Sequence, residues 1–137
     1  MINSYTITAQ DIDINENLIF AVNKVLTGCT VTHTAGTDSF KLNKPGYYYV
    51  AFDGSASTIG TAGNVTVELF SNGAAVPGAL TSTYSAAAVN VGSLGFSTIV
   101  RVLPSCNCVD NSVTLTLQNT GVEATYTNVN LTITKLC

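Results

Sequence analysis

The sequence predicts an all-β protein, an antiparallel sandwich or barrel of about eight to ten short strands. Three observations support this prediction. Apolar and polar residues alternate with period two, β-branched residues fill the alternating segments, and turn-forming residues separate them. The single helix-like stretch, Ser85–Val89, is too short to form a structural helix.

The alternation is clearest in three segments. Their apolar residues are Val65, Val67 and Leu69, then Val113, Leu115 and Leu117, then Val129, Leu131 and Ile133. Further strands are expected, in chain order, at Leu18–Leu26, Cys29–Thr34, Ser39–Leu42, Tyr47–Phe52, Ala79–Tyr84 and Phe96–Leu103. The turn signals between strands include Pro45-Gly46, Asn72-Gly73, Pro77-Gly78, Asp110-Asn111 and Thr120-Gly121.

The chain of 137 residues suits one domain, 1–137, with a short N-terminal segment at about residues 1–15. Charged residues make up only 9% of it, against roughly 25% in ordinary soluble proteins. The five cations are scattered, which argues against nucleic-acid binding. No apolar run is long enough to insert into a membrane, and Met1–Tyr5 does not resemble a secretory signal, so we expect synthesis in a cytoplasm.

The strand expected at Tyr47–Phe52 is aromatic or apolar on both faces. Such a strand cannot have one face in water, so its second face is expected to meet another sheet, another chain or a ligand. This feature makes assembly a more promising function than catalysis.

The segment Gly46–Phe52 (GYYYVAF) resembles a strand of the tumour-necrosis-factor and complement-head jelly-roll superfamily. The closer resemblance is to the C-terminal domains of bacterial collagen-like spore glycoproteins and to related domains of phage virion proteins. Asn72–Ala79 (NGAAVPGA) resembles their recurring turn, and Val129–Leu136 resembles their closing strand. The resemblance spans about Asp11 to Leu136, but the chain has no Gly-X-Y collagen segment.

This resemblance implies a ten-strand jelly roll that forms a homotrimer and has no enzymatic activity. By alignment on Gly46, one face of the strand, formed by Tyr48, Val50 and Phe52, fills the sandwich. The expected trimer interface consists of Tyr47, Tyr49, Ala51 and Leu136. A slip of one residue would exchange the two faces, and burial of both faces within one chain is the alternative to a trimer.

Ligand-binding residues are expected in the Gly-containing loops of the scaffold, because recognition usually lies on loops. The candidate loops are Ser55–Asn64 and Ser85–Leu94, and the candidate residues are Ser57, Thr58, Tyr84 and Ser93. No Gly loop precedes a helix, so a phosphate-binding loop is not expected.

The four cysteines are Cys29, Cys106, Cys108 and Cys137. Free thiols, disulfides and a metal site all remain open from their spacing, with free thiols favoured because no signal peptide is present. Cys29 lies in a strand-like stretch and is expected to be buried.

His33 is interpreted as an exposed strand residue, since no nucleophile motif accompanies it. Asp11 and Asp13 lack the spacing of a calcium loop, so they are expected to face solvent on a short strand. We therefore expect no catalytic residue, metal or cofactor. The sequons at Asn64 and Asn130 lie in expected strands and are discounted.

The sequence-based hypothesis is a trimeric virion surface protein, such as a phage head-decoration or fibre-head protein. Its expected partners are two further copies of itself, a capsid or fibre protein, and a host-surface glycan as a further candidate. The alternative is a trimeric head domain on a bacterial spore or cell surface that acts in adhesion or carbohydrate binding.

Overall fold

The computed structural model describes residues 1–106 and 110–136. Strands account for all its regular structure, and the described residues contain no helix that could span a membrane. The strands are β1 (Ile2–Thr6), β2 (Gln10–Ile12), β3 (Val22–Leu26), β4 (Val31–Thr32), β5 (Phe40–Leu42), β6 (Gly46–Thr58), β7 (Gly63–Ser71), β8 (Ala74–Ser85), β9 (Gly92–Val102), β10 (Val113–Asn119) and β11 (Ala124–Lys135).

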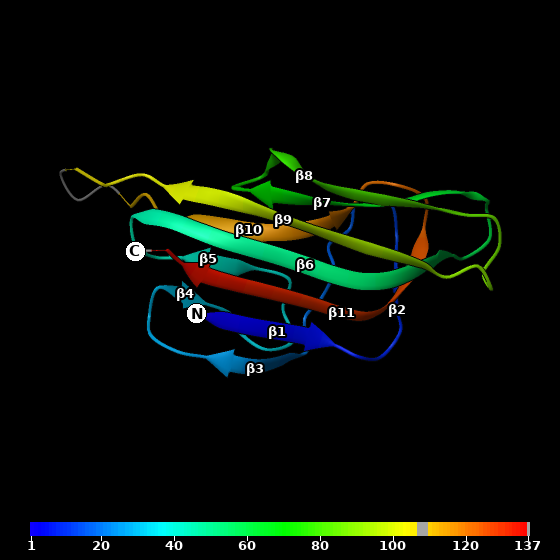
Figure 1. The fold of residues 1–137 in the computed structure, drawn as a ribbon, viewed down its shortest axis with the longest axis horizontal. Helices are drawn as coiled ribbons and strands as arrows, with labels where there is room; N and C mark the ends of the chain where they lie inside the picture. The colour runs from blue at the N-terminus through cyan, green and yellow to red at the C-terminus, as the bar shows by residue number, and fades with distance from the viewer. Residues whose placement is uncertain (107–109, 137) are drawn as a thin grey trace.

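The strands form two antiparallel sheets that pack face to face (Figure 1). Sheet A has the order β3-β1-β11-β6-β9, with β2 also pairing to β11, and sheet B has the order β4-β5-β10-β7-β8. From β6 onward the chain crosses between the sheets four times, entering sheet B at β7, returning at β9, crossing to β10 and closing with β11. The predicted all-β antiparallel sandwich is confirmed.

The core lies between the sheets and follows the alternation seen in the sequence. In β7, β10 and β11, the residues that alternate as apolar are the buried ones. The largest fully buried side chains include Tyr48, Tyr126 and Phe20. Burial of each large apolar side chain contributes about 1.5–3 kcal/mol, so this alternation is the main energetic reason for the sandwich.

The N-terminal residues contribute more than the short segment expected there. The strand expected near Ile12 is present as β2, but β1 also forms and pairs with β11 on one side and β3 on the other. Its inward residues include Ser4 and Thr6, whose hydroxyls donate to the Val22 and Ile19 carbonyls. Because these buried residues are polar, β1 lacks the apolar alternation that reveals the other strands.

Two turns follow the backbone chemistry of their residues. Asn72 and Gly73 have φ angles of 49° and 82°, which is the left-handed geometry that an Asn-Gly hairpin turn requires between β7 and β8. Gly46 begins β6 with a φ of 134°, a conformation that a residue with a side chain rarely adopts. These turns set the start of the central strand and the register of the hairpin.

Asn119 connects the end of β10 to three other parts of the chain. Its side chain is fully buried, and its amide nitrogen donates to the carbonyls of Ile12 (3.1 Å) and Val122 (3.0 Å). Its amide oxygen accepts a hydrogen bond of 2.9 Å from the Tyr126 hydroxyl. Burial raises the pKa of Tyr126, so this hydroxyl stays protonated and remains a donor.

Replacing Asn119 should destabilise the whole sandwich. Asn119→Ala leaves the Ile12 and Val122 carbonyls and the Tyr126 hydroxyl buried without these partners, so we expect the free energy of unfolding to fall by about 2–4 kcal/mol. Urea denaturation followed by circular dichroism measures this loss.

Thr116→Ala, three positions before Asn119 and on the outer face of β10, is the matched control. It should change the free energy of unfolding by no more than about 0.5 kcal/mol. Equal losses in the two variants would show that the Asn119 network contributes nothing specific.

Candidate functional site

The central strand β6 presents different residues to the core and to the outside. Tyr48, Val50 and Phe52 are buried in the sandwich at 0%, 0% and 3% exposure, as the alignment on Gly46 predicts. On the opposite face, Tyr47 and Tyr49 are 48% and 39% exposed. A tyrosine pair on the outer face of a central strand is available for contact with another molecule.

The neighbouring strand β9 extends this outer surface. The register places Arg101 opposite Tyr47, Ile99 opposite Tyr49, and a serine opposite Ala51. Ile99 is 57% exposed, and the Arg101 guanidinium lies 5.5 Å from the centroid of the Tyr47 ring. A cation in this position is attracted to the face of the ring.

We call the outer residues Tyr47, Tyr49, Ala51, Ile99 and Arg101 the aromatic patch. Leu136 lies at its end, where its backbone N–H donates to the Tyr47 carbonyl at 2.8 Å. The four residues predicted for a trimer interface therefore lie on one region of sheet A. Ile99 and Arg101 were missed, although the alternation in the expected strand Phe96–Leu103 places both on the same face.

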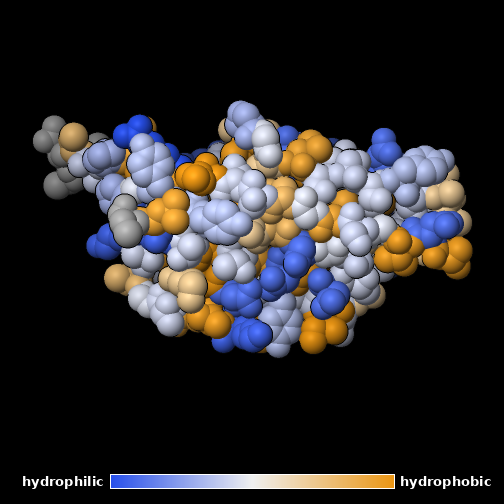
Figure 2. Space-filling view, viewed as in Figure 1, coloured by the Kyte–Doolittle hydropathy of each residue, from blue (hydrophilic) through white to orange (hydrophobic). Residues whose placement is uncertain are grey.

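Figure 2 shows the same side of the molecule as Figure 1, with sheet A in front. Pale, near-neutral residues cover much of the surface over β6 and β9, whereas hydrophilic residues gather over β1, β3 and β11. The outer face of sheet A is thus divided into a weakly polar half and a strongly polar half.

The expected ligand loops require correction. Ser57 and Thr58 belong to β6, and both are buried. The Thr58 backbone N–H donates to the Ser85 hydroxyl at 3.0 Å. These small polar residues suggested a loop, but they are buried at the last paired positions of β6 and are not accessible to a ligand.

Tyr84 and Ser93 also lie in strands, β8 and β9, but both are exposed. The Tyr84 side chain is 66% exposed at the edge of sheet B. The connection between β8 and β9 is shorter than expected and carries the exposed residues Val89 and Val91.

His33 is buried rather than exposed. Its ring stacks on Phe40 at 4.0 Å between centroids, and its nitrogens lie 2.6 Å from the Asn23 amide oxygen and 3.0 Å from the Thr37 carbonyl oxygen. Its threonine neighbours suggested an exposed strand. Instead, the ring packs on Phe40 and connects β3 to the segment before β5.

Cys29 is exposed, in contrast to the burial predicted for it, because the chain turns outward between β3 and β4. Cys106 is also exposed, and neither cysteine forms a disulfide with another residue that the structure describes. Cys108 and Cys137 lie outside the described residues, so the choice among thiols, disulfides and metal remains open for them.

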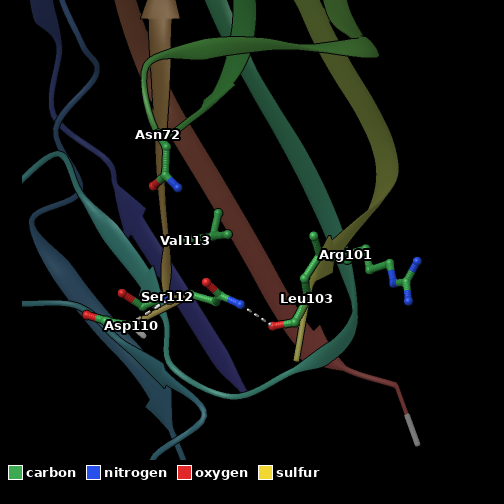
Figure 3. Close-up of a pocket in the computed structure, with 7 residues that line it drawn as sticks. Asn72, Arg101, Leu103, Asp110, Ser112 and Val113 are labelled. Carbon is green, nitrogen blue, oxygen red and sulfur yellow. Dashed lines mark hydrogen bonds between the residues drawn. The ribbon is translucent and has the colours of Figure 1, made fainter. Parts of the chain in front are cut away.

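A shallow hollow of about 270 Å³ lies at one end of the sandwich, and Figure 3 shows the residues that line it. Its polar groups largely stabilise turns: the Asn72 amide oxygen accepts from the Thr114 N–H, and the Asp110 carboxylate accepts from the Ser112 N–H. The Arg101 side chain turns away from Asp110 and Ser112. With its polar groups engaged in this way, the hollow is a poor candidate for ligand binding.

The acidic residues expected to face solvent do so. Asp11 and Asp13 are exposed, and the Asp11 carboxylate accepts from the Thr125 hydroxyl at 2.6 Å. The negative charge of Asp13 is the main cause that raises the pKa of Glu123 above its ordinary value. Within residues 1–106 and 110–136, no group of three or more acidic, histidine or cysteine side chains is arranged to hold a metal.

No protein-family model and no curated protein sequence matches this chain. Among solved structures, the chain is similar to murine APRIL at pH 5.0, with a TM-score of 0.64 and 9% identity over 98% of each chain. The fold is a TNF-like jelly roll. A second structure of murine APRIL, at pH 8.5, has a TM-score of 0.63 and 8% identity over 98% of each chain.

At these identities the similarity shows the jelly-roll fold alone. A carbohydrate-binding module, CBM35 from Cellvibrio japonicus Abf62, has a TM-score of 0.44 and 13% identity, which is too low to support a shared fold. The predicted TNF-like fold is confirmed, while the resemblance to spore-glycoprotein and phage domains remains a prediction.

The pKa of Glu123 has a consequence for stability. A carboxyl whose pKa is raised in the folded state binds protons more readily there than in the unfolded chain. The stability that protonated Glu123 contributes is present below the ordinary carboxyl pKa. It is lost as pH rises through the raised pKa that Glu123 has in the folded state. We expect Glu123→Gln to raise the Tm at pH 7, because it removes repulsion with Asp13.

Thermal unfolding at pH 7 and pH 4 measures this effect, and the gain in Tm should shrink at the lower pH. Added salt should also reduce the gain at pH 7, since it screens exposed charges. A Tm that is unchanged by the substitution at pH 7 and low salt would contradict the proposed repulsion.

Proposed function

We propose that this protein is a non-enzymatic structural protein that assembles into a homotrimer through the aromatic patch. The observation that carries the proposal is the exposure of Tyr47, Tyr49 and Ile99 side by side on β6 and the neighbouring edge strand β9 of sheet A. Covering one half-exposed tyrosine or isoleucine in an interface removes apolar area from water and makes the free energy of association more favourable by on the order of 1 kcal/mol. Three such side chains per chain favour association.

A second exposed apolar region supports contact between copies of the chain. Leu80 on β8 is 50% exposed, Tyr84 is 66% exposed, and Val91 before β9 is 61% exposed. The β8 edge and the aromatic patch are different surfaces. If the β8 edge of one copy packs against the aromatic patch of the next, the contact is heterologous. Heterologous contacts produce a closed ring when the rotation between neighbours closes, and the resemblance to the jelly-roll superfamily implies three copies.

The low charge of the chain is consistent with such an assembly. Charged residues form 9% of the sequence, and Lys41 with Asp110, at 4.0 Å, forms the one ion pair within the described residues. Few charges need to lose water when neutral surfaces pack together, so the desolvation penalty of assembly is small.

We assign the trimer to the surface of a virus-like particle, as a phage head-decoration or fibre-head protein that binds a capsid or fibre protein. The resemblance of GYYYVAF and NGAAVPGA to phage virion domains supports this role. The second candidate is a trimeric head domain on a bacterial spore or cell surface, which the same segments also support. Adjacent capsid or tail genes would support the virion role, and adjacent spore-coat or cell-wall genes would contradict it.

The purified protein should be a trimer in solution. Multi-angle light scattering is expected to give three times the chain mass of 14.2 kDa. A stable monomer at micromolar concentration would refute the assembly proposal, because chains that bury the aromatic patch on association should form trimers in that range.

Tyr49→Glu should disrupt the trimer, because a carboxylate without a partner is costly in a packed interface. Light scattering should give the monomer mass with a β-sheet circular dichroism spectrum retained. Thr116→Glu, the same type of change on the outer face of sheet B, is the control and should leave the mass of the assembly unchanged. If Tyr49→Glu retains the trimer mass, the aromatic patch is not the interface.

A further inference from the structure

A shallow polar hollow lies on the other half of the outer face of sheet A. We call it the amide hollow, and its volume is about 550 Å³. It coincides with the hydrophilic residues that gather over β1, β3 and β11 in Figure 2. The residues that line it are Asn3, Tyr5, Ile7, Lys24, Asn128 and Asn130.

Three amides line the hollow, Asn3 from β1 and Asn128 and Asn130 from β11. Asn3 donates from its amide nitrogen to the Asn130 amide oxygen at 2.8 Å and to the Thr132 hydroxyl at 2.9 Å. These bonds fix the orientation of both amides. Among the described residues, the Asn130 amide nitrogen and the Asn3 amide oxygen have no hydrogen-bond partner, so both are available to a ligand.

The third amide is positioned by an irregularity in β11. The register of β11 with β6 shifts between Thr127 and Asn130, and Asn128 within this bulge has a φ of 54°. The Asn128 N–H donates to the Ile7 carbonyl at 3.3 Å, which ties the bulge to the connection after β1. Bulges re-aim side chains and are common beside binding sites, and here the bulge places the exposed Asn128 side chain on the hollow.

The hollow combines oriented amides with one aromatic ring and nearly balanced charge. Tyr5 from β1 is half buried, so its ring is a fixed apolar wall. Lys24 is the one cation among the lining residues, and the exposed Asp53 is paired with Asn130 in the neighbouring strand. An anionic ligand would therefore meet a carboxylate next to its binding groups.

We propose that the amide hollow binds a neutral sugar residue of a surface glycan. Amides can each donate to one sugar hydroxyl and accept from another, and the flat Tyr5 ring suits the apolar C–H face of a pyranose. The site gives a location and a ligand class to the host-surface glycan expected as a partner from the sequence, and it lies over β1, β3 and β11 rather than on the aromatic patch over β6 and β9.

Titration of ¹⁵N-labelled protein by NMR tests this site directly. The probes are methyl glycosides of glucose, galactose and mannose and free N-acetylglucosamine, with sialic acid and glucuronic acid as charged probes. At least one neutral probe should shift the resonances of Asn3, Tyr5, Asn128 and Asn130 at concentrations on the order of 10 mM, because single sugars bind weakly.

Two variants locate the binding. Asn128→Gly removes the side chain while suiting the positive φ, so the fold should be retained, and we expect the Kd to rise about fivefold to tenfold. Tyr5→Ala should raise the Kd by about tenfold or more through loss of the aromatic wall. Thr116→Ala, on the outer face of the other sheet, should leave the Kd unchanged.

The outcomes separate this proposal from the trimer proposal. Shifts in the folded Tyr49→Glu variant as well as in the original protein would support the sugar site whatever the oligomeric state. No shift with any neutral probe, shifts with charged sugars alone, or a Kd that is unchanged by Asn128→Gly would overturn it. Failure of the light-scattering test with intact sugar binding would overturn the trimer alone.

Discussion

The structure depends on the hydrogen-bonded ladders on both sides of β6. This strand is thirteen residues long and pairs with β11 on one edge and β9 on the other. With both edges satisfied, its two faces are free for separate tasks. Tyr48 and Val50 anchor the core, while Tyr47 and Tyr49 stand on the outside. Alternation over the first half of this strand, Tyr47 to Phe52, is what allows one segment to hold the fold together and also present a surface for assembly.

Much of the fold could be predicted because apolar and polar residues alternate within its core strands. Alternation fails as a guide where the inward residues are polar. Ser4 in β1 and Thr58 in β6 are both buried, and each satisfies its hydroxyl by bonding to a nearby backbone carbonyl. A sequence pattern cannot show that such a carbonyl is in reach. His33 was misread for the same reason, since its burial depends on Asn23 from another strand and on Phe40 beneath the ring.

The candidate surfaces differ in how far the sequence reveals them. Tyr47 and Tyr49 are conspicuous because they lie close together on one strand that is apolar on both faces. The amide hollow has no such local signal, because Asn3 and Asn130 are 127 positions apart and meet only when β1 pairs with β11. A bulge such as that at Asn128 is also invisible in the sequence, since an asparagine there fits an ordinary strand or a turn equally well.

The pairing of β1 with β11 also constrains how the chain reaches its folded state. Ile2 lies opposite Ile133, so sheet A cannot close around its N-terminal strand until the last strand has left the ribosome. Non-local pairing of this kind slows folding, since the loop between the partners must close before the contact is gained. During that interval the edge of β1 that β11 will cover is exposed to neighbouring chains. Slow synthesis and a high local concentration of chains therefore both lower the yield of correctly folded protein.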